Sequence, residues 1–361
     1  MNIHLPTYTF LHPYLPFQAH DLTITVFIGT LLFYHLVSYS LQLYYYYYQS
    51  NNYKEWKLQI TKGIDALHDP IPWIPFFGHN KPNSAPYHRL LTTINTTLAA
   101  TFAALTTEAT LRGNNKLYYN ELPSVKSNPI ISTILSSAVL SPNQSLILEY
   151  VFIGLWIFME FFAAVVWENI AEYYWHRCMH TPFMYQRFHK LHHRYRSPMP
   201  FDDMYIHPLE ATGYYMILYS PPFLGSLHLY AFLGYMGLMG ITGICDHSGI
   251  RIKLFGSIYN TEDHDLHHER FDCNLGFPFP WLDILHGTYR GTFWGKYYNG
   301  KAPPSVPGYT DNAIVLGDTK EIRTTTMTTT MLVETNDNKI EANIPSSTKN
   351  KRSTSQTRKG K

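Results

Sequence analysis

Cysteine is scarce in this chain of 361 residues, which contains only Cys178, Cys245 and Cys273. They show no C-x2-C spacing, and an odd number of cysteines cannot all form pairs. The sequence therefore indicates neither a disulfide framework nor a thiolate metal site. A glycine-rich nucleotide-binding motif and a haem-binding signature are missing as well, so no motif indicates a nucleotide or a haem bound by the chain itself.

Charge is also sparse, and three long stretches have almost none. Asp, Glu, Lys and Arg together make up 15% of the residues and leave a net charge of +2. Residues 22–48 and 211–245 contain none of the four, and residues 150–167 contain Glu160 alone. A helix that crosses a bilayer needs about 20 apolar residues, so these stretches predict membrane spans. An acid inside a span is costly, which makes Glu160 a functional or partner-bound residue by default, although an interior-facing position would make it merely structural.

The longest stretch predicts two helices. Residues 211–245 would overshoot a bilayer about 30 Å thick as a single helix, and Pro221-Pro222, with several glycines behind them, interrupt it. We therefore expect a helical hairpin. With residues 22–48 and 150–167 it gives about four spans. The uncharged residues 90–107 are rich in Thr and Asn, so their membrane status stays open.

Both ends of the chain are expected in the cytosol. Residues 1–20 have no basic n-region and no A-x-A-like cleavage site, so we expect the first span to act as an uncleaved anchor. From about Asp318 the composition predicts disorder, and the basic end favours the cytosolic side. Arg358 and Lys359 resemble a dibasic retrieval signal of the endoplasmic reticulum. No aromatic residues accompany this charge, which argues against nucleic-acid binding.

Histidine, in contrast, is plentiful and clustered. Eight of the 19 histidines fall in three boxes with the patterns H-x3-H, H-x2-H-H and H-x2-H-H, at residues 176–180, 189–193 and 264–268. Residues three and four apart lie on one face of a helix, so each box offers two or three imidazoles that converge on one point. Eight imidazoles exceed the three or four that one zinc ion takes, and imidazole also suits iron. The boxes therefore predict two metals.

The three boxes, in this order and spacing, resemble those of the fatty acid hydroxylase / sterol desaturase superfamily of membrane-bound, non-haem di-iron oxygenases. Residues 206–210, 246–249 and 277–289, the last of which includes the run 281–289, resemble further segments of that superfamily. The resemblance covers residues 145–295, with a weaker likeness at residues 56–59. It implies ten metal ligands, which are His176, His180, His189, His192, His193, His207, His247, His264, His267 and His268.

Carboxylates commonly fix a ligand ring through its second nitrogen. Six acids near the boxes could do so, and we expect about half of them to take this role: Glu172, Glu210, Asp246, Asp263, Asp265 and Glu269. Beyond the metal ligands, the sequence indicates no catalytic or cofactor-binding residue.

The resemblance also implies a reaction. Members use O2 and two electrons to attack an unactivated C–H bond, and the electrons come from NAD(P)H through a separate donor, cytochrome b5 or an equivalent. The boxes and residues 207–210 are more similar to sterol-modifying members than to sphingolipid fatty-acyl hydroxylases. The expected substrate is therefore a sterol or related lipid. The expected type is a sterol C-5 desaturase, C-4 methyl oxidase or sterol hydroxylase, and a fatty-acyl or alkylglycerol hydroxylase is the alternative.

Two other classes stay open, a zinc-dependent membrane hydrolase and a metal transporter. Zinc hydrolases of the gluzincin type carry H-E-x-x-H, and the first box lacks that glutamate. A transporter would need polar groups distributed through its spans, which show few. Two irons in the purified protein would favour the oxygenase.

The expected architecture is an all-α integral membrane bundle with a cytosolic helical cap that carries the boxes, located in the endoplasmic reticulum membrane. Residues 1–144 would form an anchor region with one or two spans and residues 145–295 the di-iron catalytic domain. Residues 296–361 would form an extension.

Overall fold

The computed structural model describes residues 20–60, 85–119, 132–133, 141–254, 258–294 and 296–300. All of them belong to one compact unit, Met1–Pro307. The disorder expected from residue 318 lies outside the described residues.

Helices dominate the described part of the chain. The longer ones are α1 (Asp21–Leu41), α3 (Ala85–Leu111), α5 (Pro142–Met179), α7 (Pro208–Leu218), α9 (Leu229–Asp246) and α10 (Thr261–Arg270). The short helical elements are η2 (Gln42–Tyr48), η3 (Ser50–Asn52), α2 (Tyr53–Trp56), α6 (Pro182–Met184), η6 (Tyr185–His189), η7 (His192–Arg194), η8 (Asp202–Met204), α8 (Pro221–Leu224) and α11 (Trp281–His286).

The strands of the described residues form three small ribbons. β1 (Leu117–Tyr118) pairs in parallel with β2 (Leu227–His228), with Leu117 opposite Leu227. The antiparallel ribbons are β3 (Lys253–Leu254) with β4 (Tyr259–Asn260) and β5 (Arg290–Phe293) with β6 (Lys296–Asn299). The fold is therefore all-α in character, as the sequence predicts.

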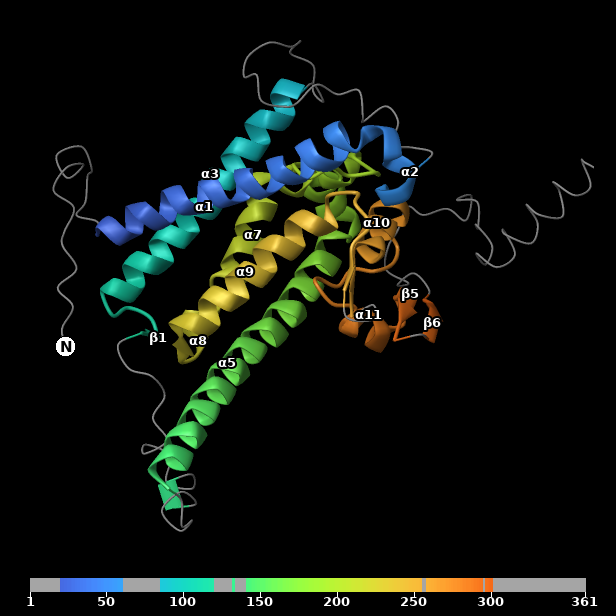
Figure 1. Cartoon of the computed structure of the whole chain (residues 1–361). Helices are drawn as coiled ribbons and strands as arrows, with labels where there is room; N and C mark the ends of the chain where they lie inside the picture. The colour runs from blue at the N-terminus through green and yellow to red at the C-terminus, as the bar shows by residue number, and fades with distance from the viewer. Residues whose placement is uncertain are drawn as a thin grey trace, which may run out of the picture. The chain divides into compact units, whose positions relative to one another are not determined.

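The five helices α1, α3, α5, α7 and α9 form a bundle (Figure 1). α1 packs along α3, α3 along α7, and both α7 and α9 pack on α5. The core contains alanines from four of these helices, namely Ala99 and Ala103 of α3, Ala164 of α5, Ala211 of α7 and Ala231 of α9. Small residues let helices approach closely, which is typical of helix contacts inside membranes.

Three helical segments within the described residues are long and apolar enough to cross a membrane: Asp21–Tyr48, Asn143–Met179 and Leu229–Asp246. Large apolar side chains on the first two are exposed, such as Leu36 and Leu155. An exposed apolar surface of this extent fits contact with lipid. The first two segments include the predicted spans 22–48 and 150–167.

The structure differs from the predicted hairpin in the first half of residues 211–245. Pro221 and Pro222 begin α8, so the chain is interrupted where the sequence indicated. However, α7 has 11 residues, about 16 Å at 1.5 Å per residue, and is too short to cross a bilayer about 30 Å thick. Of the two legs, α9 alone is long enough. Residues 90–107 are helical within α3 but are not among the candidate spans.

Glu160, the single acid in the apolar part of α5, is hydrogen-bonded. Its carboxylate accepts from the Tyr118 hydroxyl at 2.8 Å, the Trp156 indole at 2.9 Å and the His228 backbone N–H at 2.8 Å. It therefore joins α5 to the β1–β2 ribbon, and its partners explain how an acid is tolerated there.

Candidate metal centre

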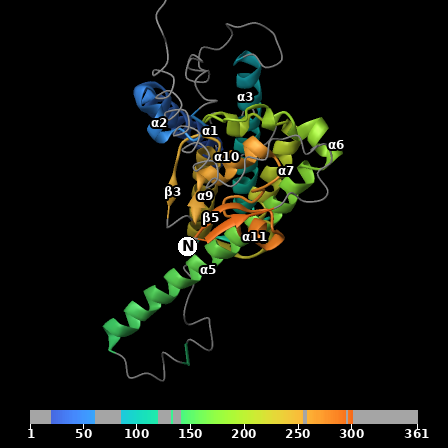
Figure 2. The same ribbon diagram turned by 90° about the vertical axis from the view of Figure 1, so that its right-hand side faces the viewer.

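The first box lies at the carboxyl end of α5, and Figure 2 shows α11 beside this helix. A capping box of Ser141 and Gln144 starts α5, and its last turn carries His176, with His180 as the next residue on the same face. η6 and η7 carry the second box. α10 carries the third, and Asn260 caps it by accepting from the Glu262 backbone N–H at 3.2 Å.

Nine of the described histidines form two groups. Within each group the possible ligand atoms lie within 4.8 Å of one another, and every member is buried. Group one is His176, His180, His189, His193 and His267. Group two is His192, His247, His264 and His268. Boxes two and three thus divide their histidines between the groups, whereas the sequence pattern suggested one point per box. On α10, His264 and His268 are one turn apart, whereas His267 is rotated from them by about 60° and 100°, which is enough to direct its ring to group one.

The spacing of the ring nitrogens fits a metal ion. In group one the Nε2 atoms of His189 and His193 are 2.9 Å apart, as are those of His189 and His180. In group two the Nε2 atoms of His247 and His264 are also 2.9 Å apart. Neighbouring nitrogens on an octahedral ion with bonds of about 2.1 Å would be separated by about 3.0 Å. Both groups match that geometry.

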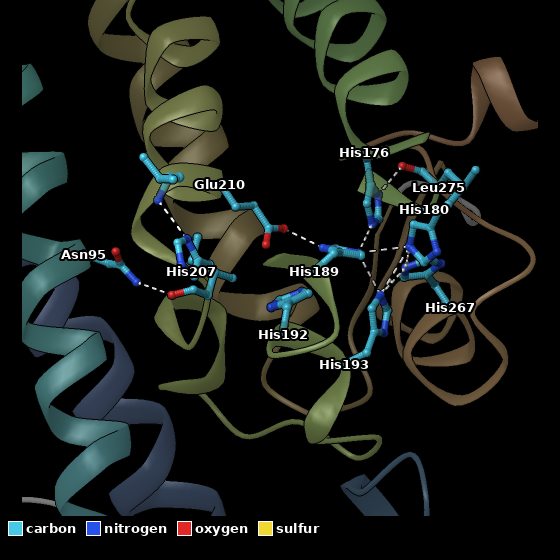
Figure 3. A network of polar contacts seen from close by, with 12 residues as sticks. Asn95, His176, His180, His189, His192, His193, His207, Glu210, His267 and Leu275 are labelled. Carbon is cyan, nitrogen blue, oxygen red and sulfur yellow. Dashed lines mark hydrogen bonds and ion pairs between the residues drawn. The ribbon is translucent and has the colours of Figure 1, made fainter. Parts of the chain in front are cut away.

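The second nitrogens of several rings are fixed by acceptors, which leaves Nε2 for a metal. His176 Nδ1 donates to the Leu275 carbonyl at 2.8 Å and His267 Nδ1 to the Cys273 carbonyl at 2.7 Å. His189 Nδ1 donates to Glu210 at 2.5 Å, as Figure 3 shows. Within the described structure, the Nε2 atom of His268 is buried and has no hydrogen-bond partner. An orphaned ring nitrogen of this kind is what a metal would satisfy.

Burial favours the neutral form of six imidazoles in the two groups. It lowers the pKa of His180, His193 and His267 well below the ordinary value, and the neighbouring imidazoles lower it further. Burial and neighbouring imidazoles lower the pKa of His192, His264 and His268 in the same way. A ligand ring must be neutral to bind a metal. These six rings are therefore already in the form that binds a metal at neutral pH.

The structure does not bring His207 into either group of described histidines. Its ring lies on the side of the cluster toward Asn95 (Figure 3). Its Nδ1 atom accepts from the Leu209 backbone N–H at 3.2 Å, so His207 caps the start of α7. The ring also packs edge-on against Phe188. The resemblance implies that His207 is a metal ligand, and the contact that the structure shows for its ring nitrogen is the cap of α7.

The acids near the boxes have different roles. Glu210 accepts from His189 Nδ1 at 2.5 Å, which is the kind of contact expected for about half of these acids. Asp265 accepts from Gln59 at 2.9 Å and Asp263 from the Tyr289 hydroxyl at 3.0 Å. Asp203, which the sequence reasoning missed, lies 3.4 Å from His247 Nδ1. No local pattern marked Asp203, because it comes from η8 and reaches the site only through the fold.

The loop that accepts from His176 and His267 is held by Asp283. This buried carboxylate accepts from the Leu275 backbone N–H at 2.9 Å, from Gly276 N–H and from the Thr288 hydroxyl at 2.6 Å. Asp283 belongs to the 281–289 segment that stood out in the sequence. That segment therefore supports the ligand rings from behind.

A cavity of about 570 Å³ opens beside the histidines. His176 of group one lines it, together with His192, His247 and His264 of group two. The remaining wall comes mainly from α1, α7 and α9 and is largely apolar. The site therefore combines two groups of histidines that could each hold a metal with a pocket suited to an apolar molecule.

A sequence model of the fatty acid hydroxylase family matches residues 161–288. Residues 161–288 are therefore similar to a fatty acid hydroxylase domain. The matched segment includes all three boxes and also residues 207 and 247. No solved structure matches the chain significantly.

Relatives of the domain include several sterol enzymes. The chain is 30% identical over 138 residues to a Delta(7)-sterol 5(6)-desaturase of Gibberella zeae, which is 38% of this chain and 40% of the relative. It is 31% identical over 140 residues to lathosterol oxidase of Mus musculus, which is 37% of this chain and 44% of the relative. It is 31% identical over 135 residues to fatty acid hydroxylase domain-containing protein 2 of Homo sapiens (37% and 39%). In each case less than half of the relative is matched.

Proposed function

We propose that this protein is a membrane-bound, non-haem di-iron oxygenase that acts on a sterol or a related lipid. The observation that carries the proposal is the arrangement of nine buried histidines in two groups beside one largely apolar cavity. The matched family supports an oxygenase. The relatives named for sterol oxidation support the substrate class.

The two histidine groups would each hold one iron. Bound iron would supply the O2 activation needed to attack an unactivated C–H bond, chemistry that side chains alone do not provide. The chain's own residues keep the ligand rings neutral, orient them through Glu210 and the Leu275 and Cys273 carbonyls, and surround them with protein. Electrons would come from NAD(P)H through cytochrome b5 or an equivalent donor, since the sequence has no nucleotide or haem motif.

The protein would lie in the endoplasmic reticulum membrane with its termini and boxes on the cytosolic side. The exposed apolar surfaces of α1 and α5 support a membrane location, and the basic tail supports the orientation. A glycosylation acceptor engineered near residue 195 should stay unmodified in microsomes. Efficient glycosylation there would invert the proposed orientation.

The decisive experiment combines metal analysis with lipid profiling. We expect about two irons per purified chain, and expression in a yeast strain that lacks its own C-5 desaturase or C-4 methyl oxidase should change the sterol profile at one position. His193→Ala serves as the inactive control. Zinc as the sole metal would contradict the oxygenase. An unchanged sterol profile with altered acyl chains or alkylglycerols would move the protein to a fatty-acyl or ether-lipid branch.

A further inference from the structure

The wall of the cavity contains both acidic and apolar side chains. Glu168, Glu172 and Asp203 line it together with the histidines, whereas Val26 and Phe33 of α1 and Leu233 and Met236 of α9 are apolar lining residues. An acid within a membrane-spanning helix is a functional residue by default. The proposed iron chemistry does not use Glu168 or Glu172, so their presence needs a separate explanation.

The two glutamates lie in line with the metal site. Glu168, Glu172 and His176 follow each other at intervals of four residues on α5, which puts them on one face with about 6 Å of rise per step. The carboxyl groups of Glu168 and Glu172 hydrogen-bond each other, and the Tyr235 hydroxyl donates to Glu168 at 2.8 Å. Two carboxyl groups in such contact cannot both be ionised, so the pair carries a proton and can both donate and accept.

Many other polar atoms of the wall already have partners. The Tyr215 hydroxyl donates to the Asn95 carbonyl at 3.1 Å, the Thr30 hydroxyl to the Val26 carbonyl at 2.8 Å, and the Thr96 hydroxyl to the Thr92 carbonyl at 2.8 Å. These groups contribute little to recognition, because their hydrogen-bonding capacity is used within the protein. The Tyr34 hydroxyl and Asp203 also line the cavity, so the glutamate pair is one of the few places where a polar group on a ligand would find partners, and the one that offers both a donor and an acceptor.

We propose that Glu168 and Glu172 bind the hydroxyl group of a neutral lipid alcohol and so position the carbon that is oxidised. This inference rests on the proposed function and specifies how the substrate lies. The hydroxyl end would enter first, and the reacting carbon would be only a few bonds from the hydroxyl. The apolar remainder of the molecule would extend between α1 and α9.

Charge and shape both favour such a ligand. An acidic pair repels the carboxylate of a free fatty acid but accepts a hydrogen bond from an alcohol. Gly29 of α1 and Gly237 of α9 line the cavity, and no atom of the described structure lies within 4 Å of a Cβ built on either. The helices therefore leave room for a broad, rigid body. For a sterol, this orientation selects ring carbons near the hydroxyl and excludes the side chain.

The test compares two ligands that differ only in the hydroxyl, lathosterol and cholest-7-ene, on the iron-loaded protein in lipid nanodiscs. Hydrogen bonds that involve a charged group contribute about 1.5–3 kcal/mol, so wild type should bind lathosterol about 10- to 100-fold more tightly. Equal binding of the two ligands by wild type would overturn the inference without any variant. Oxidation of the lathosterol side chain would also overturn it.

Variants test whether the two glutamates cause the preference for the ligand with a hydroxyl group. Glu172→Leu and Glu168→Leu should bind both ligands alike, whereas Glu172→Gln keeps a hydrogen-bonding amide and should retain a preference. Glu149→Gln, on the same helix outside the cavity lining, is the matched control and should behave as wild type. Iron content and melting temperature identify a misfolded variant, for which the wild-type ligand comparison still decides.

The outcomes separate the inference from the proposed function. If wild type converts lathosterol and the Leu variants keep the full preference, the positioning role of the glutamates is wrong and the oxygenase stands. If iron-loaded wild type neither binds nor converts either ligand, the proposed sterol function fails and the inference fails with it.

Discussion

The two histidine groups differ in how they are enclosed. Group one has five rings, and carbonyls and a carboxylate hold three of them from behind. Group two has four rings, and three of these, those of His192, His247 and His264, line the cavity. Metal sites that only hold a structure are closed, whereas reactive ones keep an open position. The difference suggests that group one is the more saturated site and that group two is the side that a substrate meets.

Removing one ligand from each group is the strongest way to test this difference. Loss of a residue that merely supports a ligand already costs 10- to 100-fold, so His180→Ala and His264→Ala should each reduce product formation by more than about 100-fold. His264→Ala leaves three rings in group two, and we expect it to lose about one iron. His180→Ala leaves four, and should keep more of its metal. Iron analysis and product assays measure both, and full activity in either variant would refute the assignment.

The supports behind the rings should have smaller effects. Glu210→Gln weakens the anchor of His189, so metal affinity at group one should fall by about 10- to 100-fold. The matched change at group two is Asp203→Asn. It should cost less, because His247 Nδ1 also lies 2.9 Å from the Gly243 carbonyl while Asp203 is 3.4 Å away. Chelator competition provides the measurement. A larger loss for Asp203→Asn would reverse the comparison.

Lys57 supports the chain next to group two. The Lys57 backbone pairs with Ile250, and its ammonium lies 3.1 Å from the Tyr46 hydroxyl, which donates to the Ser248 carbonyl at 2.6 Å. Burial lowers the pKa of Lys57 to about 8, although Asp265 and Asp202 oppose this effect. The unfolded chain therefore binds this proton more tightly than the folded protein does.

The lowered pKa of Lys57 makes the stability of the folded protein depend on pH. A lowered folded pKa gives stability that is fully present above the unfolded pKa and is lost as the pH falls from about 10.5 to about 8. Melting temperature measured in detergent should thus contain a contribution that rises over this interval, and Lys57→Met should remove it. The control is Lys54→Met, because Lys54 is an exposed residue of α2. An identical pH dependence in Lys57→Met and wild type would contradict the burial argument.

The site could be predicted from sequence as far as its signals are local. The helical period brings His176 and His180 to one face, so the boxes could be recognised directly. The division of boxes two and three between the groups depends on how η7 and α10 pack, which spacing does not encode. The acceptors at Leu275 and Cys273 are backbone carbonyls, and any residue type supplies one.

The same distinction applies to the spans. Residues 22–48 and 150–167 were recognisable because a run with no charge, or with Glu160 alone, is a local property. The hairpin was predicted with two spanning legs because the charge-free run was judged by its full length, although only residues 211–220 of that run precede the break at Pro221. The start of α7 is set by His207 and Pro208, a capping residue followed by proline at the first helical position.

His207 should produce the smallest effect, and it tests whether either group has another histidine ligand. Because it caps α7 and lies outside both groups of described histidines, His207→Ala should keep two irons and most of the activity. The lost cap should cost about 1 kcal/mol, which lowers the melting temperature by about 2–4 °C. His247→Ala is the matched control, since the sequence marked both residues equally and the structure places only His247 in a described group. We expect that control to lose about one iron. A similar loss in His207→Ala would make it a tenth ligand and remove the contrast between a five-ring and a four-ring site.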